Sequence, residues 1–85
     1  MHIGPAFIRT VTHNYTCNVL GLADGMILVS DVAWIADTGC RLGQFLASGP
    51  TSATEIEPMP GCHSIGLGAV VDVSAWPHPL PAKAQ

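Results

Sequence analysis

Charged side chains are scarce in this 85-residue chain, which has three basic and six acidic residues and a formal net charge of −3. The cations Arg9, Arg41 and Lys83 are too few to follow a nucleic-acid backbone, because such binding needs a stripe of positive charge. The acidic residues are also too few to imitate a polyanion. We therefore expect no direct binding of nucleic acid.

Long apolar runs are missing as well. No apolar stretch reaches the roughly 18 residues that span a bilayer. The first residues do not combine a basic start with a long apolar segment, as a signal peptide does. These absences predict a protein without membrane contact that is located in the cytoplasm.

Cysteines are few and widely spaced. Cys17, Cys40 and Cys62 are an odd number without a Cys-x-x-Cys pair, which argues against a secreted disulfide framework. Together with His63 they include the ligand types of a zinc site, but no local spacing brings them together. Isolated thiols are typical core residues, so we expect no metal and no cofactor.

Hydrophobic residues, in contrast, make up 48% of the chain, and the mean hydropathy is +0.39. A domain of this size buries only about 60–65% of the surface that its unfolded chain exposes. Few charged residues are available to cover the remainder. Some apolar surface is therefore expected in an interface, either with another protein or in a homo-oligomer such as a dimer.

Strand-forming residues fill the first part of the chain. Runs rich in Ile, Val, Thr, Tyr and Phe predict strands at Ala6–Thr12 and Tyr15–Leu22. Asp24-Gly25 between apolar runs predicts a type I′ hairpin turn, followed by a strand over residues 26–35. Strict alternation along that strand would place Trp34 and Asp31 on opposite faces.

The period changes after Gly39, where apolar residues recur at intervals of three and four. This spacing predicts one short helix at about residues 39–48, with Asp37 or Thr38 as its cap. A loop containing a short extended piece at 54–57 should follow, and then a last strand at Ile65–Ser74.

The predicted fold class is α+β and mainly β. We expect a small twisted antiparallel sheet of about four to five strands, with one short helix packed on it. Residues 1–75 would form a single small β-rich domain, and residues 76–85 a Pro-rich extended tail with a mobile end. The tail could be an extended ligand for an aromatic groove, although Trp76 more often closes a sheet in such a position.

The triplet Asp37-Thr38-Gly39 resembles the catalytic motif of retropepsin-like aspartic proteases. In that family two chains each contribute one aspartate, and the pair shares a proton. Cys40 departs from the family pattern, and a helix is expected where those enzymes continue in strands toward a flap. A cap or turn is the favoured interpretation, so no catalytic residue is predicted. A homodimeric protease using Asp37 remains an alternative.

A wider frame covers about Ile8 to Val73 and resembles a family of short uncharacterised proteins from phages and mobile elements, which form a domain of unknown function. The residues that carry the resemblance are Ile8-Arg9-Thr10, Asp24-Gly25, Asp31-Val32-Ala33-Trp34-Ile35, Leu42 to Gly49, and Gly68-Ala69-Val70-Val71-Asp72-Val73. The resemblance implies a context in the host bacterial cytoplasm. Small phage proteins of this kind are often inhibitors of bacterial antiviral defence, and anti-CRISPR proteins are one such class.

The leading hypothesis is accordingly a non-enzymatic phage-type inhibitor, most specifically an anti-CRISPR protein that occludes a CRISPR effector complex. An acidic patch can meet the basic nucleic-acid channel of an effector. The predicted partner-binding residues are Asp31, Trp34, Asp37, Glu55 and Glu57. The alternative is an oligomeric binder of a small anionic ligand, such as a nucleotide signal, held between subunits by Arg9 and Arg41.

Overall fold

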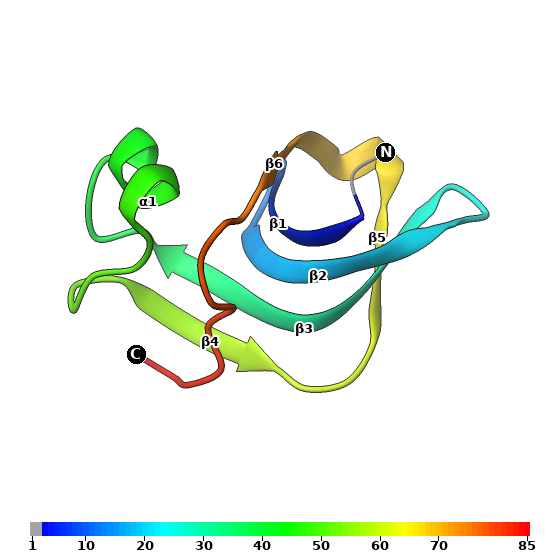
Figure 1. Cartoon of the computed structure of the whole chain (residues 1–85). Helices are drawn as coiled ribbons and strands as arrows, with labels where there is room; N and C mark the ends of the chain where they lie inside the picture. The colour runs from blue at the N-terminus through cyan, green and yellow to red at the C-terminus, as the bar shows by residue number, and fades with distance from the viewer. Residues whose placement is uncertain (1–2) are drawn as a thin grey trace.

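The computed structural model describes residues 3–85 and has the predicted class: a small, mainly β, α+β fold with one antiparallel sheet and one helix (Figure 1). Its elements, in chain order, are β1 (Gly4–Thr10), β2 (Asn14–Ala23), β3 (Met26–Asp37), α1 (Leu42–Ser48), β4 (Glu55–Met59), β5 (His63–Gly66), the 3₁₀ turn η1 (Leu67–Ala69) and β6 (Val70–Ala75). No helix among these residues is long and apolar enough to cross a membrane.

The sheet is built around the long strand β3. Its strand order is β4-β3-β2-β1-β6, and β5 pairs with β3 beyond the end of β4. Thus β4 occupies the second half of one edge of β3, opposite residues 32–37, and β5 occupies the first half, opposite residues 26–29. The turn at Asp24 and Gly25 has φ of 52° and 74°, which confirms the predicted hairpin.

The last predicted strand, Ile65–Ser74, is divided in the structure. Its first part, β5, lies against β3, whereas β6 lies against β1 at the far side of the sheet. The turn η1 joins the two, and the backbone N–H of Leu67 donates to the carbonyl of Gly25 at 3.0 Å. One straight strand cannot reach both edges, so the chain bends where Gly66 and Gly68 remove side-chain bulk.

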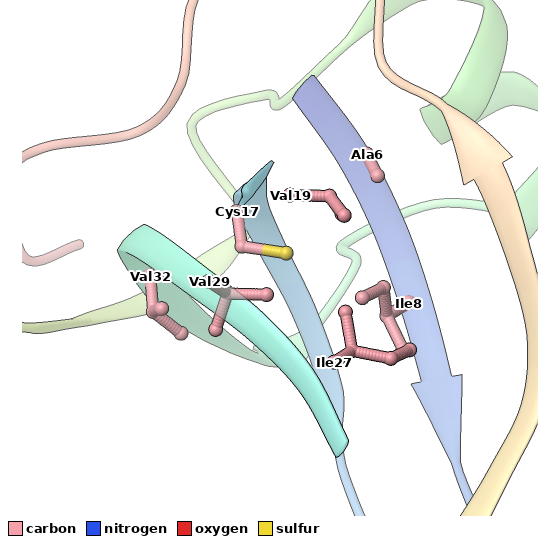
Figure 2. Packing of buried hydrophobic residues seen from close by; sticks show 7 residues of the cluster. All are labelled: Ala6, Ile8, Cys17, Val19, Ile27, Val29 and Val32. Atoms are coloured by element: carbon pink, nitrogen blue, oxygen red, sulfur yellow. The ribbon is translucent and has the colours of Figure 1, made fainter. Parts of the chain in front are cut away.

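One core cluster lies on the concave side of the curled sheet (Figure 2). It consists of Ala6, Ile8, Cys17, Val19, Ile27, Val29 and Val32. Tyr15, Met59, Ile65, Val70 and Val73 pack around it. Strands β5 and β6 therefore close over the same cluster from opposite edges, which explains why the divided strand is stable.

The second core cluster lies on the other face, beneath α1 and the C-terminal segment. The ring of Phe7 contacts Phe45 of α1 edge-on, with centroids 5.5 Å apart, and stacks on Trp76 at 6.2 Å. Phe45 and Trp76 also meet, at 5.1 Å. Aromatic contacts of this kind add to the burial of the rings, so the trio anchors the helix to the sheet as predicted.

Strict alternation along the third strand is wrong at Asp31. This residue has φ of 51°, in the left-handed region. The pairing of β3 with β2 skips one residue there, passing from Ser30 to Ala33 while β2 passes from Asn18 to Thr16. Such a bulge changes the side-chain period. Val32 consequently joins Ile27 and Val29 in the concave cluster instead of lying opposite them.

The helix begins later than predicted and without the predicted cap. Its N-cap is Arg41, and no side chain caps it. Asp37 Oδ1 instead accepts a hydrogen bond from the backbone N–H of Gly39 at 2.8 Å, and Thr38 Oγ1 donates to the carbonyl of Cys40 at 2.6 Å. Both side chains stabilise the turn between β3 and α1 and do not reach the helix.

The Pro-rich segment 76–85 is extended, but it is packed against the domain. Trp76 is buried, and its Nε1 donates to the carbonyl of Pro79 at 3.2 Å. His78 Nε2 donates to the carbonyl of Leu46 in α1 at 2.8 Å. Gln85 exchanges two backbone hydrogen bonds with Ile56, at 2.8 and 3.0 Å. The end of the segment thus forms a short pairing along the outer edge of β4.

Candidate ligand-binding groove

Three side chains of different strands form a row across the sheet. Tyr15 of β2 lies opposite Trp34 of β3, and Trp34 lies opposite Glu57 of β4. Residues directly opposite in antiparallel strands project to the same face, with Cβ atoms about 4.5–5.5 Å apart. Two half-buried aromatic rings and an exposed carboxylate therefore stand side by side at the rim of the concave face.

A third ring, His13, comes from the turn between β1 and β2. Its centroid lies 5.1 Å from that of Trp34, with the planes inclined at 63°. It lies 6.1 Å from the Tyr15 ring and nearly parallel to it, at 19°. Thr10 Oγ1 holds the turn by accepting from the His13 backbone N–H at 3.0 Å and donating to the His13 carbonyl at 2.7 Å. The imidazole thus forms one wall of the groove.

The opposite wall comes from β4 and the loop that follows it. Pro58, Met59, Pro60 and His63 line this side. His63 Nε2 lies 3.2 Å from the Met59 carbonyl and 3.0 Å from that of Pro60. Because carbonyl oxygens only accept, Nε2 carries the hydrogen, and the ring is locked to the loop. The open groove has a volume of about 470 Å³, within the usual range of ligand sites.

The groove and its surroundings carry negative charge. Glu57 is its one charged lining residue, and neither Lys nor Arg lines it. Glu55 lies two residues earlier on β4 and directly opposite Asp37 at the end of β3. Within residues 3–85 the ion pair is Arg9–Asp72, so none of these three carboxylates forms an ion pair with a residue that the structure describes. Like charges placed opposite one another across strands are destabilising.

Asp31 belongs to a second pocket on the side of the C-terminal segment. This pocket has a volume of about 480 Å³, and Met59, Cys62, Leu80 and Pro81 are among the residues that line it. The Asp31 carboxylate accepts a hydrogen bond from Ser30 Oγ at 3.2 Å. Of the five predicted site residues, the structure therefore places Trp34 and Glu57 in the groove, Glu55 and Asp37 at its acidic edge, and Asp31 elsewhere.

The sequence predictions missed His13, Tyr15 and His63. The pairing of Tyr15 with Trp34 follows from counting outward from the Asp24-Gly25 turn, because two bulges cancel. One extra residue in β2, Leu20, is offset by the extra residue at the Asp31 bulge in β3. No comparable pattern places His63, since β5 is brought to β3 only by the fold.

The Asp-Thr-Gly triplet is a packed turn. Thr54 Oγ1 donates to the carbonyl of Thr38 at 2.8 Å. Gly39 has φ of 74°, and a Cβ added to it would lie 2.6 Å from the carbonyl carbon of Ala53. Asp37 is exposed and accepts the Gly39 hydrogen bond described above. Each residue of the triplet thus has a structural role in joining β3 to the segment before β4.

The thiols differ in environment. Cys17 is buried in the concave cluster, and burial raises the pKa of its thiol to about 12. Cys40 is half-buried and Cys62 exposed, and all three cysteines are free. In the part of the chain that the structure describes, no three His, Cys, Asp or Glu side chains are grouped as metal ligands would be.

No protein-family model matches the chain, and neither a curated protein nor a solved structure is similar to it.

Proposed function

We propose that this chain is a non-enzymatic binding protein that occludes a surface of a protein partner, in the manner of a phage-encoded inhibitor of bacterial defence. The observation that carries the proposal is the open groove of Tyr15, Trp34 and Glu57 on an acidic sheet edge. Large aromatic side chains are typical anchors of protein interfaces. A half-buried tryptophan and tyrosine beside the Glu57 carboxylate combine such anchors with charge that selects a partner.

The proposed partner is a CRISPR effector complex in the host bacterial cytoplasm. Effectors hold nucleic acid in positively charged channels. The carboxylates of Asp37, Glu55 and Glu57 on neighbouring strands match such a surface in sign, and complementary charge raises both association rate and specificity. Occlusion of the channel needs no catalytic group, which suits a chain of this size.

Binding to purified CRISPR effector complexes tests the proposal, together with plaque assays on CRISPR-active hosts. The chain should retain an effector on a resin and restore plaques. Trp34→Ala and Glu57→Gln should weaken both effects, whereas Asp24→Asn, a charge change at the hairpin tip, should leave them intact. Failure to bind any effector type, with no rescue of plaques, would exclude this partner.

We also propose that the chain self-associates through the β2–β3 hairpin. Leu20, Met26 and Leu28 in this hairpin are 38–51% exposed, and a second copy would cover them. Light scattering should give a mass near twice 8.9 kDa, and Leu28→Ser should lower it to that of one chain. A monomer at all concentrations would contradict this interface without affecting the groove.

The two alternatives have less support. Arg9, expected to hold a small anion, is paired with Asp72, and no Lys or Arg lines either pocket described above. Native mass spectrometry of protein from infected cells would detect such an anion as a co-purifying small mass. Asp37→Asn tests the aspartic protease hypothesis. Peptide cleavage by the unmodified chain that is lost in Asp37→Asn would support the protease, whereas no cleavage by either form would exclude it.

A further inference from the structure

We propose that the groove binds a cationic side chain of the partner, and specifically the guanidinium of an arginine. The inference rests on the proposed function only in taking the ligand to be part of a protein. Its basis is the row of Tyr15, Trp34 and Glu57, which places aromatic faces and a carboxylate at adjacent register positions.

The aromatic rings supply the first half of the site. A cation is attracted to the face of an aromatic ring within about 6 Å of its centre, and tryptophan is the strongest partner. Trp34 and Tyr15 are only half-buried, although they stand between core strands. His13 contacts both rings, so three rings are gathered at this side of the groove. The proposal places the flat guanidinium over the part of the Trp34 ring that stays exposed.

Glu57 supplies the second half. It is directly opposite Trp34, so a guanidinium that lies over the indole has a carboxylate at its edge. Glu55 and Asp37 extend the negative field along the same edge, and within residues 3–85 neither forms an ion pair with a cation of the chain. A planar guanidinium can stack on a ring and donate to a carboxylate with the same plane, which a lysine ammonium cannot do.

Other ligand classes use less of the groove. An anion would meet Glu57 and find no Lys or Arg in the lining. A proline-rich segment would contact the rings, as in other aromatic-lined grooves, but would leave Glu57 unpaired. An arginine side chain uses both the rings and the carboxylate, so the negative charge of Glu57 favours it over the other ligand classes.

The test is a titration of ¹⁵N-labelled full chain with the peptide acetyl-Gly-Arg-Gly-amide, followed by NMR. The two indole N–H signals serve as reporters, because Trp34 lines the groove whereas Trp76 is buried and donates to Pro79. The Trp34 signal should move saturably and the Trp76 signal should not. Glu57→Gln should weaken binding at least ~five-fold. Trp34→Ala lacks the reporter indole, so its binding is followed by the backbone amide signals of Tyr15 and Glu57, and it should be weaker still.

Controls separate the charge from the shape. The same peptide with citrulline is neutral and nearly isosteric, and it should bind at least ~five-fold more weakly. Asp24→Asn should bind the arginine peptide like the unmodified chain. Equal binding of the citrulline or a Pro-rich peptide would overturn the proposal, as would an unmoved Trp34 signal at ~50 mM peptide, where even a weak contact is measurable.

These outcomes are independent of the effector assay. If the arginine peptide binds and no effector does, the groove is a cation site and the CRISPR partner is wrong. If an effector binds through Trp34 while the peptide does not, the partner is supported and the arginine assignment is wrong.

Discussion

At the residue scale, Gly39 shows that the Asp-Thr-Gly triplet, a motif typical of catalysis, has a structural role in this chain. Its φ of 74° favours glycine, and a side chain there would enter the backbone at Ala53 and Thr54, at 2.6–2.8 Å. The neighbouring Thr38 is held by Thr54 Oγ1. The contact joins the end of β3 to the start of β4, so glycine is required at this point regardless of any chemistry at Asp37.

We predict that Gly39→Ala lowers the free energy of unfolding by about 2–4 kcal/mol, because it combines backbone strain with a steric clash. The matched control is Gly43→Ala within α1, where an added Cβ meets nothing within 4 Å. That change should stabilise the chain by roughly 0.5–1 kcal/mol. Denaturant titration measures both. Equal effects of the two substitutions would show that the turn does not depend on Gly39.

The cysteines give a second prediction at this scale. Thiol alkylation requires the thiolate, and burial raises the pKa of Cys17 to about 12. Iodoacetamide at pH 8 should therefore modify exposed Cys62 first, half-buried Cys40 more slowly and Cys17 only after unfolding. Mass spectrometry of timed samples, with urea-unfolded chain as the reference, gives the order. Rapid native labelling of Cys17 would contradict its place in the core.

At the scale of elements, one ion pair links β1 to β6. Arg9 lies opposite Asp72, and its Nε is 2.9 and 3.0 Å from the two carboxylate oxygens. These hydrogen bonds hold the pKa of Asp72 below its usual 3.8. Both side chains are about two fifths exposed, at 38% and 42%, so solvent and salt weaken the interaction.

Asp72→Asn should therefore destabilise the chain modestly at neutral pH. A lowered carboxyl pKa adds stability that is complete above the unfolded value of 3.8 and disappears as the pH falls through the folded value. The difference between variant and unmodified chain should thus shrink as the pH falls below 3.8 and disappear once Asp72 is also protonated in the folded chain. Thermal melts at several pH values and salt concentrations measure it, with Asp24→Asn as control. A difference that persists at low pH would mean that the pair is not its cause.

At the scale of the whole molecule, the C-terminal segment is part of the structure on which the groove depends. Trp76 packs on Phe7 and Phe45, while Gln85 pairs with Ile56 along the outer edge of β4. That strand carries Glu57. An uncovered sheet edge is a site for unwanted pairing, so the segment both fills the second core and protects the strand that presents the carboxylate.

Trp76→Ala should accordingly cost about 3–5 kcal/mol, as expected for a buried aromatic residue. This is a large part of the ~5–15 kcal/mol stability of a small domain. The control Val11→Ala, at a side chain that is 73% exposed, should change stability by less than ~0.5 kcal/mol. Denaturant unfolding measures both, and limited proteolysis should cut residues 77–85 faster in the variant. An unchanged cleavage rate would show that Trp76 does not hold the segment.

The sequence predicts only part of the candidate site, and individual residues show why. Trp34 and Glu57 are among the predicted partner-binding residues. Tyr15 is not among them, although the register counted from the Asp24-Gly25 turn places it opposite Trp34. Asp31 was grouped with them, whereas the bulge at this residue places it in the other pocket. No motif in the sequence marks His13 or His63 as a site residue. The turn between β1 and β2 brings His13 to the groove, and the pairing of β5 with β3 brings His63 there.

The sequence by itself determined the mainly β class, the Asp24-Gly25 hairpin and a helix around Phe45, because side-chain period and turn residues act locally. Only the tertiary structure decided the rest. The bulge at Asp31, the division of β5 from β6 and the docking of Trp76 all depend on which apolar surfaces can be buried together. The groove is of the same kind, since β4 brings Glu57 beside the Tyr15–Trp34 pair and β5 brings His63 to β3 from a later part of the chain.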